Sequence, residues 1–173
     1  MIQVYTGDGK GKTTAALGLA LRAAGHSMKS VIIQFMKSHS CGYGEHESIR
    51  MLYPYVEIYA FGRDCFVSKE NPNQVDREYA LEAFEFFKKS LRSGSYRIFI
   101  LDEVCVALDY GLIPLVELVR LLRDIDKDET EVVLTGRYAP QELLEIADLV
   151  TEFKELKHYY SKEGIMGRKG IDF

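Results

Sequence analysis

The stretch that most restricts the fold of this chain is residues 4–14, which read VYTGDGKGKTT. It nearly matches the phosphate-binding pattern G-x-x-x-x-G-K-[ST], with Thr6 in place of the first glycine. Such a loop follows a buried strand and begins a helix. The chain supplies an apolar run at Ile2–Tyr5 and a helical pattern at Lys12–Ala24 that ends at Gly25. The sequence therefore predicts a strand–loop–helix unit that binds a nucleotide.

The residues of this loop have separate chemical roles. Gly7, Gly9 and Gly11 allow successive backbone N–H groups to converge on phosphate oxygens, and the helix that follows adds the partial positive charge of its N-terminus. The Lys12 ammonium would neutralise phosphate charge, and the Thr13 hydroxyl would ligate Mg²⁺. The alternative is a glycine-rich turn with a purely structural role, which the G-K-T sequence between strand and helix disfavours.

Short apolar runs alternate with longer helical patterns along the rest of the chain. This rhythm is typical of parallel strands joined by crossover helices, and the most apolar runs indicate strands buried on both faces. We expect an α/β fold with a mostly parallel sheet of five or six strands and helices on both faces. The expected strands are Ile2–Tyr5, Val31–Phe35, Val56–Tyr59, Ile98–Leu101, Glu131–Thr135 and, less clearly, Leu149–Thr151, and the further helices are Gln74–Leu91, Leu115–Arg123 and Pro140–Ala147.

Two stretches without a regular pattern, Lys37–Pro54 and Ala60–Asn73, would lie at the carboxyl edge of this sheet. Ligands bind at that edge in open α/β folds. The chain has no repeat, no low-complexity tract and no linker rich in Pro, Gly or Ser, so we expect one domain over residues 1–173.

A second motif, IFILDEV, ends an apolar run in Asp102 and Glu103. This pattern is typical of a buried strand that delivers carboxylates to a metal ion beside a phosphate loop. Ordinary acidic residues at a strand end are the alternative. The sequence leaves open which of the two carboxylates contacts the metal.

Composition limits the partners and the compartment. The chain carries 22 lysines and arginines against 26 acidic residues, a net charge of −4, which argues against a nonspecific grip on nucleic acid. Its three cysteines form no C-x-x-C pair, which favours a reduced, intracellular compartment. We find neither a secretion signal nor an apolar run that could span a bilayer, so we expect a cytoplasmic protein without membrane contact.

Several motifs occur together: YTGDGKGKTTAALGLALRAAGH, VIIQFMKS followed by GYGE, ILDEV, VLTGRYAP and the closing GRKGIDF. With them the chain resembles, nearly end to end, the P-loop type of ATP:corrinoid adenosyltransferase, which acts on cob(I)alamin or cob(I)yrinic acid a,c-diamide. The resemblance implies a P-loop NTPase-like (RecA-like) fold and transfer of the 5′-deoxyadenosyl group of ATP to the cobalt of a reduced corrinoid, with release of triphosphate. It also implies a role in adenosylcobalamin biosynthesis or salvage, Mg²⁺ or Mn²⁺, a homodimer, and an electron donor such as a reduced flavoprotein.

The same resemblance implies roles for individual residues, of which Lys12, Phe66 and Arg137 would be catalytic. Thr13 with Glu103, and Asp102 beside them, would serve the metal. The remaining implied site residues are Thr6, Gly7, Asp8, Gly9, Lys10, Gly11, Lys12, Thr13 and Thr14 for the nucleotide, and Lys37, Glu45, Arg63, Cys65 and Phe66 for the corrinoid.

The loop after the third expected strand departs from the family pattern of bulky aromatics against the lower face of the corrin ring. It reads AFGRDCFVSKEN, so Phe66 is the first aromatic candidate and Phe61 the second, while Arg63 and Cys65 occupy positions that are aromatic in some members. A core role for Phe66 under a long loop is the alternative.

Other interpretations use the same loop differently. A P-loop NTPase or kinase would cleave the γ-phosphate, and a regulator without enzymatic activity would only sense ATP.

Among the histidines, we expect His26, His39 and His46 at the surface, whereas His158 could approach the site.

Overall fold

The computed structural model describes residues 1–64 and 67–172. They form one six-stranded, entirely parallel sheet with the strand order β3-β2-β4-β5-β1-β6. The elements in chain order are β1 (Ile2–Thr6), α1 (Lys12–Ala24), β2 (Ser30–Phe35), the 3₁₀ turn η1 (His39–Cys41), α2 (Gly44–Arg50), β3 (Val56–Phe61), α3 (Gln74–Ser93), β4 (Ile98–Asp102), α4 (Val104–Asp109), α5 (Leu115–Arg123), β5 (Glu131–Thr135), α6 (Gln141–Ile146), β6 (Leu149–Glu152) and α7 (Tyr159–Glu163).

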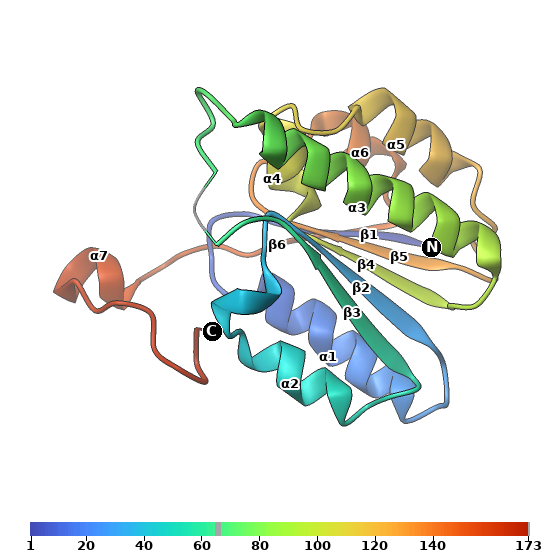
Figure 1. The fold of residues 1–173 in the computed structure, drawn as a ribbon, viewed down its shortest axis with the longest axis horizontal. Helices are drawn as coiled ribbons and strands as arrows, with labels where there is room; N and C mark the ends of the chain where they lie inside the picture. Colours follow the sequence, from blue (N-terminus) through green and yellow to red (C-terminus); the bar gives the residue numbers. More distant parts are fainter. Residues whose placement is uncertain (65–66, 173) are drawn as a thin grey trace.

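The helices form two layers on opposite faces of the sheet. Helices α1 and α2 cover one face and α3, α4, α5 and α6 cover the other, while α7 and the C-terminal stretch lie apart from the sheet (Figure 1). The fold class expected from the sequence is confirmed: the sheet is parallel, six strands form it and helices cover both faces.

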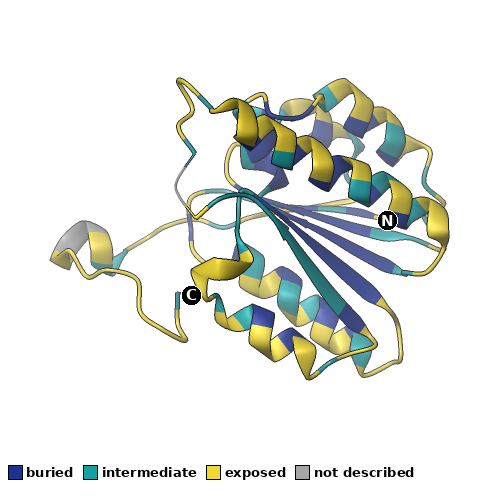
Figure 2. Cartoon of the chain, viewed as in Figure 1, coloured by how far each residue is buried: buried dark blue, intermediate teal, exposed yellow. Residues whose placement is uncertain are grey.

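The central strands are buried because both of their faces are covered. Every residue of β2 and β4 is buried, which matches their mostly apolar sequences (Figure 2). One apolar cluster lies between the sheet and α3–α5 and contains Phe84, Phe87 and Phe99. A smaller cluster under α1 contains Ala16, Ala20 and Ile98. The small alanines of α1 let this helix lie close to the sheet and present its N-terminus at the carboxyl edge.

The helical content exceeds the expectation from sequence. The stretch Lys37–Pro54, expected to be irregular, contains η1 and α2, and the short helices α4 and α7 were not anticipated. All of these have seven residues or fewer, too short for a 3.6-residue apolar period to repeat. Long α3 is confirmed and shows both an Asn73 capping box and a left-handed Gly94 at its end. No helix among the described residues is long and apolar enough to cross a bilayer.

Candidate active site

The phosphate loop connects β1 to α1, as the sequence predicts. Gly11 has φ 116°, a left-handed conformation that glycine adopts easily, and α1 begins directly after it at Lys12. The Lys12 ammonium donates hydrogen bonds to the carbonyl oxygens of Gly7 at 2.6 Å and Gly9 at 2.8 Å. Burial lowers the pKa of Lys12. The ammonium therefore lies inside the curve of the loop, where phosphate oxygens would replace carbonyl oxygens as its partners.

Two loop glycines are also needed for packing against the segment that follows β6. The Gly9 N–H donates to the carbonyl oxygen of Phe153 at 2.6 Å. A Cβ at Gly9 would lie 2.7 Å from that oxygen, and one at Gly7 would lie 2.5 Å from it. Phosphate binding, the role inferred from the sequence, therefore does not by itself explain these glycines. They are also needed because the loop packs closely against the segment that follows β6.

A fully buried carboxylate, Asp102 at the end of β4, joins the loop to the neighbouring strands. Its Oδ1 accepts hydrogen bonds from the hydroxyls of Thr13 at 2.8 Å and Thr135 at 2.7 Å. Its Oδ2 accepts from the Lys37 ammonium at 2.8 Å and from the Gln34 amide at 3.1 Å. The two oxygens thus bind different sides of the site. Oδ1 binds the phosphate loop and β5, and Oδ2 binds side chains at the end of β2 and just after it.

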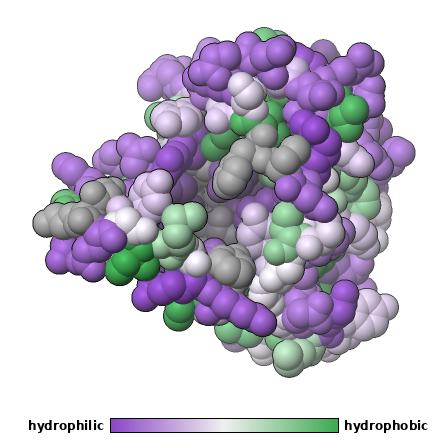
Figure 3. Space-filling view, turned by 60° about the vertical axis from the view of Figure 1, so that its left-hand side comes forward, coloured by the Kyte–Doolittle hydropathy of each residue, from purple (hydrophilic) through white to green (hydrophobic). Residues whose placement is uncertain are grey.

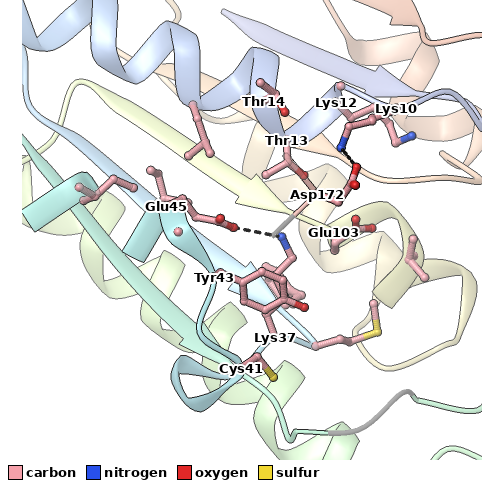
Figure 4. A pocket seen from close by; sticks show the side chains of 18 of the residues that line it. Lys10, Lys12, Thr13, Thr14, Lys37, Cys41, Tyr43, Glu45, Glu103 and Asp172 are labelled. Atoms are coloured by element: carbon pink, nitrogen blue, oxygen red, sulfur yellow. Dashed lines mark ion pairs between the residues drawn. The ribbon is translucent and has the colours of Figure 1, made fainter. Parts of the chain in front are cut away.

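Charge pairing keeps Asp102 and Lys37 ionised despite their burial. Burial opposes charge on both groups, but the facing ammonium lowers the pKa of Asp102, and the facing carboxylate raises the pKa of Lys37. The Glu45 carboxylate of α2 lies 3.7 Å from the same ammonium, as the dashed line in Figure 4 marks, and the Tyr43 ring lies 5.1 Å from it. Lys37 therefore sits between two carboxylates at the floor of the site.

Glu103 differs from its neighbour Asp102 in backbone conformation, in hydrogen bonding and in the direction of its pKa shift. Its backbone has a left-handed φ of 62°, unusual for a residue with a side chain, and its N–H donates to the Thr135 hydroxyl. Within the described part of the chain, no donor hydrogen-bonds to its carboxylate, which lines the cavity. Burial and the charge of Asp102 raise its pKa. The strained backbone directs an unpaired carboxylate towards the phosphate loop.

A cavity of about 1280 Å³ opens at this edge of the sheet. The face that Figure 3 turns forward is mostly hydrophilic and carries separate apolar areas. The expected site residues that line the cavity are Asp8, Gly9, Lys10, Gly11, Lys12, Thr13, Thr14, Lys37, Glu45, Arg63, Glu103 and Arg137. Thr6, Gly7 and Asp102 are not among the lining residues, and Cys65 and Phe66 fall outside the described residues. Phe61 is partly buried and packs against Phe86 at the border of the apolar core, with ring centroids 5.6 Å apart.

The closing sequence motif returns to the phosphate loop. Asp172 forms an ion pair with Lys10 at 2.7 Å (Figure 4). The Asp172 carboxylate also accepts hydrogen bonds from the backbone N–H of Arg168 at 2.9 Å and from the Tyr159 hydroxyl. His158, as the sequence suggested, lines the cavity. The C-terminal stretch is therefore part of the site, and it supplies a negative charge where a phosphate would bind.

Two charged residues that line the cavity are also paired. The Arg63 guanidinium donates two hydrogen bonds of 2.8 Å to the carboxylate of Asp76, the buried acid in the first turn of α3. Arg137 lies at the exposed rim, with its Nε 3.6 Å from the carboxylate of Asp8. Arg137 thus reaches the phosphate loop itself.

Sequence reasoning missed four residues of this site: Gln34, His46, Thr135 and Asp172. Gln34 and Thr135 are fully buried polar residues within apolar strands, and that interruption of the pattern is a usable signal. His46 was expected at the surface but is buried on α2, 5% exposed, with its ring against Gln34. That expectation was wrong because α2 itself was not recognised. Asp172 gave no signal apart from its place in a motif.

Comparisons with known proteins agree with this geometry. The family model described as ATP:corrinoid adenosyltransferase BtuR/CobO/CobP matches residues 1–173. A corrinoid adenosyltransferase of Sinorhizobium is 37% identical over 100% of this chain and 80% of its own length, and one of Escherichia coli K12 is 33% identical over 100% and 85%. The solved structure of the KaiC-like protein PH0186 from Pyrococcus horikoshii has a TM-score of 0.52 at 16% identity, covers 87% of this chain and 71% of its own, and supports the RecA-like P-loop fold. The chain therefore belongs to the ATP:corrinoid adenosyltransferase family and is a transferase.

Proposed function

We propose that this enzyme transfers the 5′-deoxyadenosyl group of ATP to the Co(I) centre of a reduced corrinoid and releases inorganic triphosphate. The observation that carries the proposal is a single cavity that joins the phosphate loop to Lys37 and Glu45 on the other side of the site. Its volume of about 1280 Å³ exceeds the roughly 300–1,000 Å³ of a site for one small ligand. It offers room for two co-substrates side by side.

The reaction requires the whole triphosphate to leave together. The Co(I) electron pair forms the bond to C5′ while the bond from C5′ to the α-phosphate oxygen breaks, and that oxygen takes the bonding pair. No protein base is needed, so the chain must orient C5′ towards cobalt and stabilise the departing polyanion. Lys12 and Lys10 provide positive charge within the loop. The family resemblance further implies that ATP binds reversed, with its γ-phosphate where other P-loop proteins place the α-phosphate.

The residues beside the loop fit a divalent cation, Mg²⁺ or Mn²⁺. The unpaired carboxylate of Glu103 and the hydroxyl of Thr13 provide hard oxygen donors next to the expected phosphates. Asp102 would act through Thr13, because both of its oxygens already accept two hydrogen bonds. When bound, the cation would neutralise the negative charge that develops on the triphosphate.

The corrinoid would occupy the side of the cavity lined by Lys37, Glu45 and Arg63, with Arg137 at the boundary with the nucleotide. Phe66 and Cys65 stay candidates for the lower face of the corrin ring. We further propose that residues 1–173 act as one cytoplasmic domain, that the enzyme is a homodimer supplied with electrons by a reduced flavoprotein, and that it serves adenosylcobalamin biosynthesis or salvage.

The product test separates this reaction from the other chemistry of phosphate loops. The protein is incubated without oxygen with ATP, Mg²⁺ and chemically reduced cob(I)alamin, and the phosphate products are resolved. We expect triphosphate and light-sensitive adenosylcobalamin in equal amounts, and no product from Lys12→Ala. ADP and phosphate without a cobalt–carbon product would refute the proposal and indicate an NTPase.

A further inference from the structure

His46 is a buried histidine with an unusual set of contacts. It lies on α2, next to Glu45, and its Nε2 is 2.6 Å from the Oε1 atom of Gln34 on β2. The rings of His39 and Tyr43 flank it, with centroids 4.7 and 5.8 Å away. Its Nδ1 has no hydrogen-bond partner within residues 1–64 and 67–172. A buried nitrogen without a hydrogen-bond partner costs free energy. The one side-chain hydrogen bond that the His46 ring makes among the described residues, to Gln34, therefore has to offset that cost.

The surrounding carboxylates fix which atom donates in that contact. The Gln34 Nε2 atom lies 3.1 Å from Asp102 Oδ2 and 3.3 Å from Glu45 Oε1. Ionised carboxylates only accept hydrogen bonds, so the amide NH₂ must face them and the amide oxygen must face His46. His46 Nε2 is therefore the protonated donor, and Nδ1 keeps a free lone pair. Burial lowers the pKa of His46, which agrees with a neutral ring.

This hydrogen bond connects α2 to the polar network at the floor of the site. Glu45 approaches Lys37 from α2, whereas Lys37 and Gln34 both belong to the end of β2 and its following turn. The His46–Gln34 contact, at 2.6 Å, is a buried polar link between these two elements and is shorter than the Gln34–Glu45 contact of 3.3 Å beside it. It acts on the Oδ2 side of Asp102, whereas Thr13 of the phosphate loop is held on the Oδ1 side.

We propose that His46 is a positioning residue for the corrinoid side of the site: its Nε2–H orients the Gln34 amide, which in turn holds Glu45 of α2 against the Lys37–Asp102 pair. The inference rests on the proposed function for the identity of that substrate. It predicts that losing the donor disturbs corrinoid use selectively, because the Thr13 and Thr135 bonds to Asp102 keep the nucleotide side in place. If His46 only filled space, replacing it would change the use of ATP and of the corrinoid to a similar extent.

Three variants separate these roles. His46→Leu removes the donor and keeps an apolar side chain, and His46→Gln restores an amide N–H near the Nε2 position. Ile98→Val is the stability control, because Ile98 is buried in the cluster beneath α1 and takes no part in the hydrogen bonds of the network. Michaelis constants for ATP and for cob(I)alamin are measured for each, together with thermal unfolding. Independently of activity, ¹⁵N NMR of labelled histidine identifies which nitrogen of His46 is protonated in the wild-type protein.

We expect His46→Leu to raise the KM for the corrinoid about tenfold, the effect of losing one buried hydrogen bond, while the KM for ATP changes less than about twofold. His46→Gln should recover most of the loss, Ile98→Val should shift neither constant, and the NMR spectra should show protonated Nε2. Equal changes in both constants, no recovery by glutamine, or protonated Nδ1 would overturn the proposal. A wild-type protein that forms no adenosylated corrinoid would refute the proposed function instead, and the NMR measurement would still test the His46–Gln34 contact.

Discussion

Replacing Lys37 with methionine tests whether the buried ion pair at the floor of the site is needed for stability. The Lys37 side chain is 15% exposed and faces the wholly buried Asp102 at 2.8 Å. Methionine keeps most of the volume but removes the charge, which leaves the carboxylate uncompensated. Breaking a buried pair in this way costs about 3–5 kcal/mol. Because Asp102 retains hydrogen bonds from Thr13, Thr135 and Gln34, we expect about 3 kcal/mol, the lower end of that range.

The pH dependence of stability between pH 5 and pH 7 should differ between the wild-type protein and this variant. In the wild-type protein the pKa of Asp102 is lowered and that of Lys37 is raised. The pair therefore stabilises the fold between the two unfolded-state pKa values, about 4 and about 10, and is lost as the pH falls or rises through the shifted values. Without the ammonium, burial raises the pKa of Asp102, so Lys37→Met should become more stable as the pH falls from 7 to 5.

Urea unfolding followed by circular dichroism at pH 7 and pH 5 measures both effects, since urea does not screen charge. A loss of about 3 kcal/mol should also lower Tm by roughly 6–12 °C for a chain of this size. The double variant Lys37→Met/Asp102→Asn removes the stranded charge and should recover about half of the loss or more. A loss below about 1 kcal/mol, or a double variant no more stable than Lys37→Met, would refute the reasoning.

Two further substitutions test the loop and its neighbouring carboxylate. Glu103→Gln should abolish most turnover, yet raise the stability at pH 7, because the raised pKa of Glu103 means that its ionised form disfavours the fold as the pH rises. Thermal unfolding at pH 7 should show this gain and at pH 4 should not; a less stable variant at pH 7 would contradict it. Gly9→Ala should destabilise by about 1–3 kcal/mol in urea, because the new Cβ meets the Phe153 carbonyl at 2.7 Å. Gly18→Ala in α1, where a Cβ has nothing within 4 Å, is the matched control and should stabilise by about 0.5–1 kcal/mol; equal effects of the two alanines would argue against the clash.

The sequence determined the local elements with long or strongly apolar patterns. The six strands, α1 after the phosphate loop, and α3 were all predicted close to their observed bounds, since continuous apolar runs and sustained 3.6-residue periods are properties of the chain itself. The order of strands in the sheet was not predicted, because it depends on which strands pair after the helices cross over. The same holds for α2, whose seven residues are stabilised by packing on β3 rather than by their own pattern.

In the site, too, some features were predictable from the sequence and others depend on the tertiary structure. The motifs pointed to the phosphate loop, the Asp102–Glu103 pair and Lys37 because each lies at the carboxyl end of a strand or just beyond it, and parallel strands bring their carboxyl ends to one edge. The tertiary structure alone decided which carboxylate is held by four hydrogen bonds and which is left unpaired, because that depends on Thr135, Gln34 and Lys37 arriving from other strands. It also decided the burial of His46 and the pairing of Asp172 with Lys10, 162 positions earlier in the chain. Contacts between residues so far apart in sequence leave no local pattern; only the folded chain brings their charges within reach of each other.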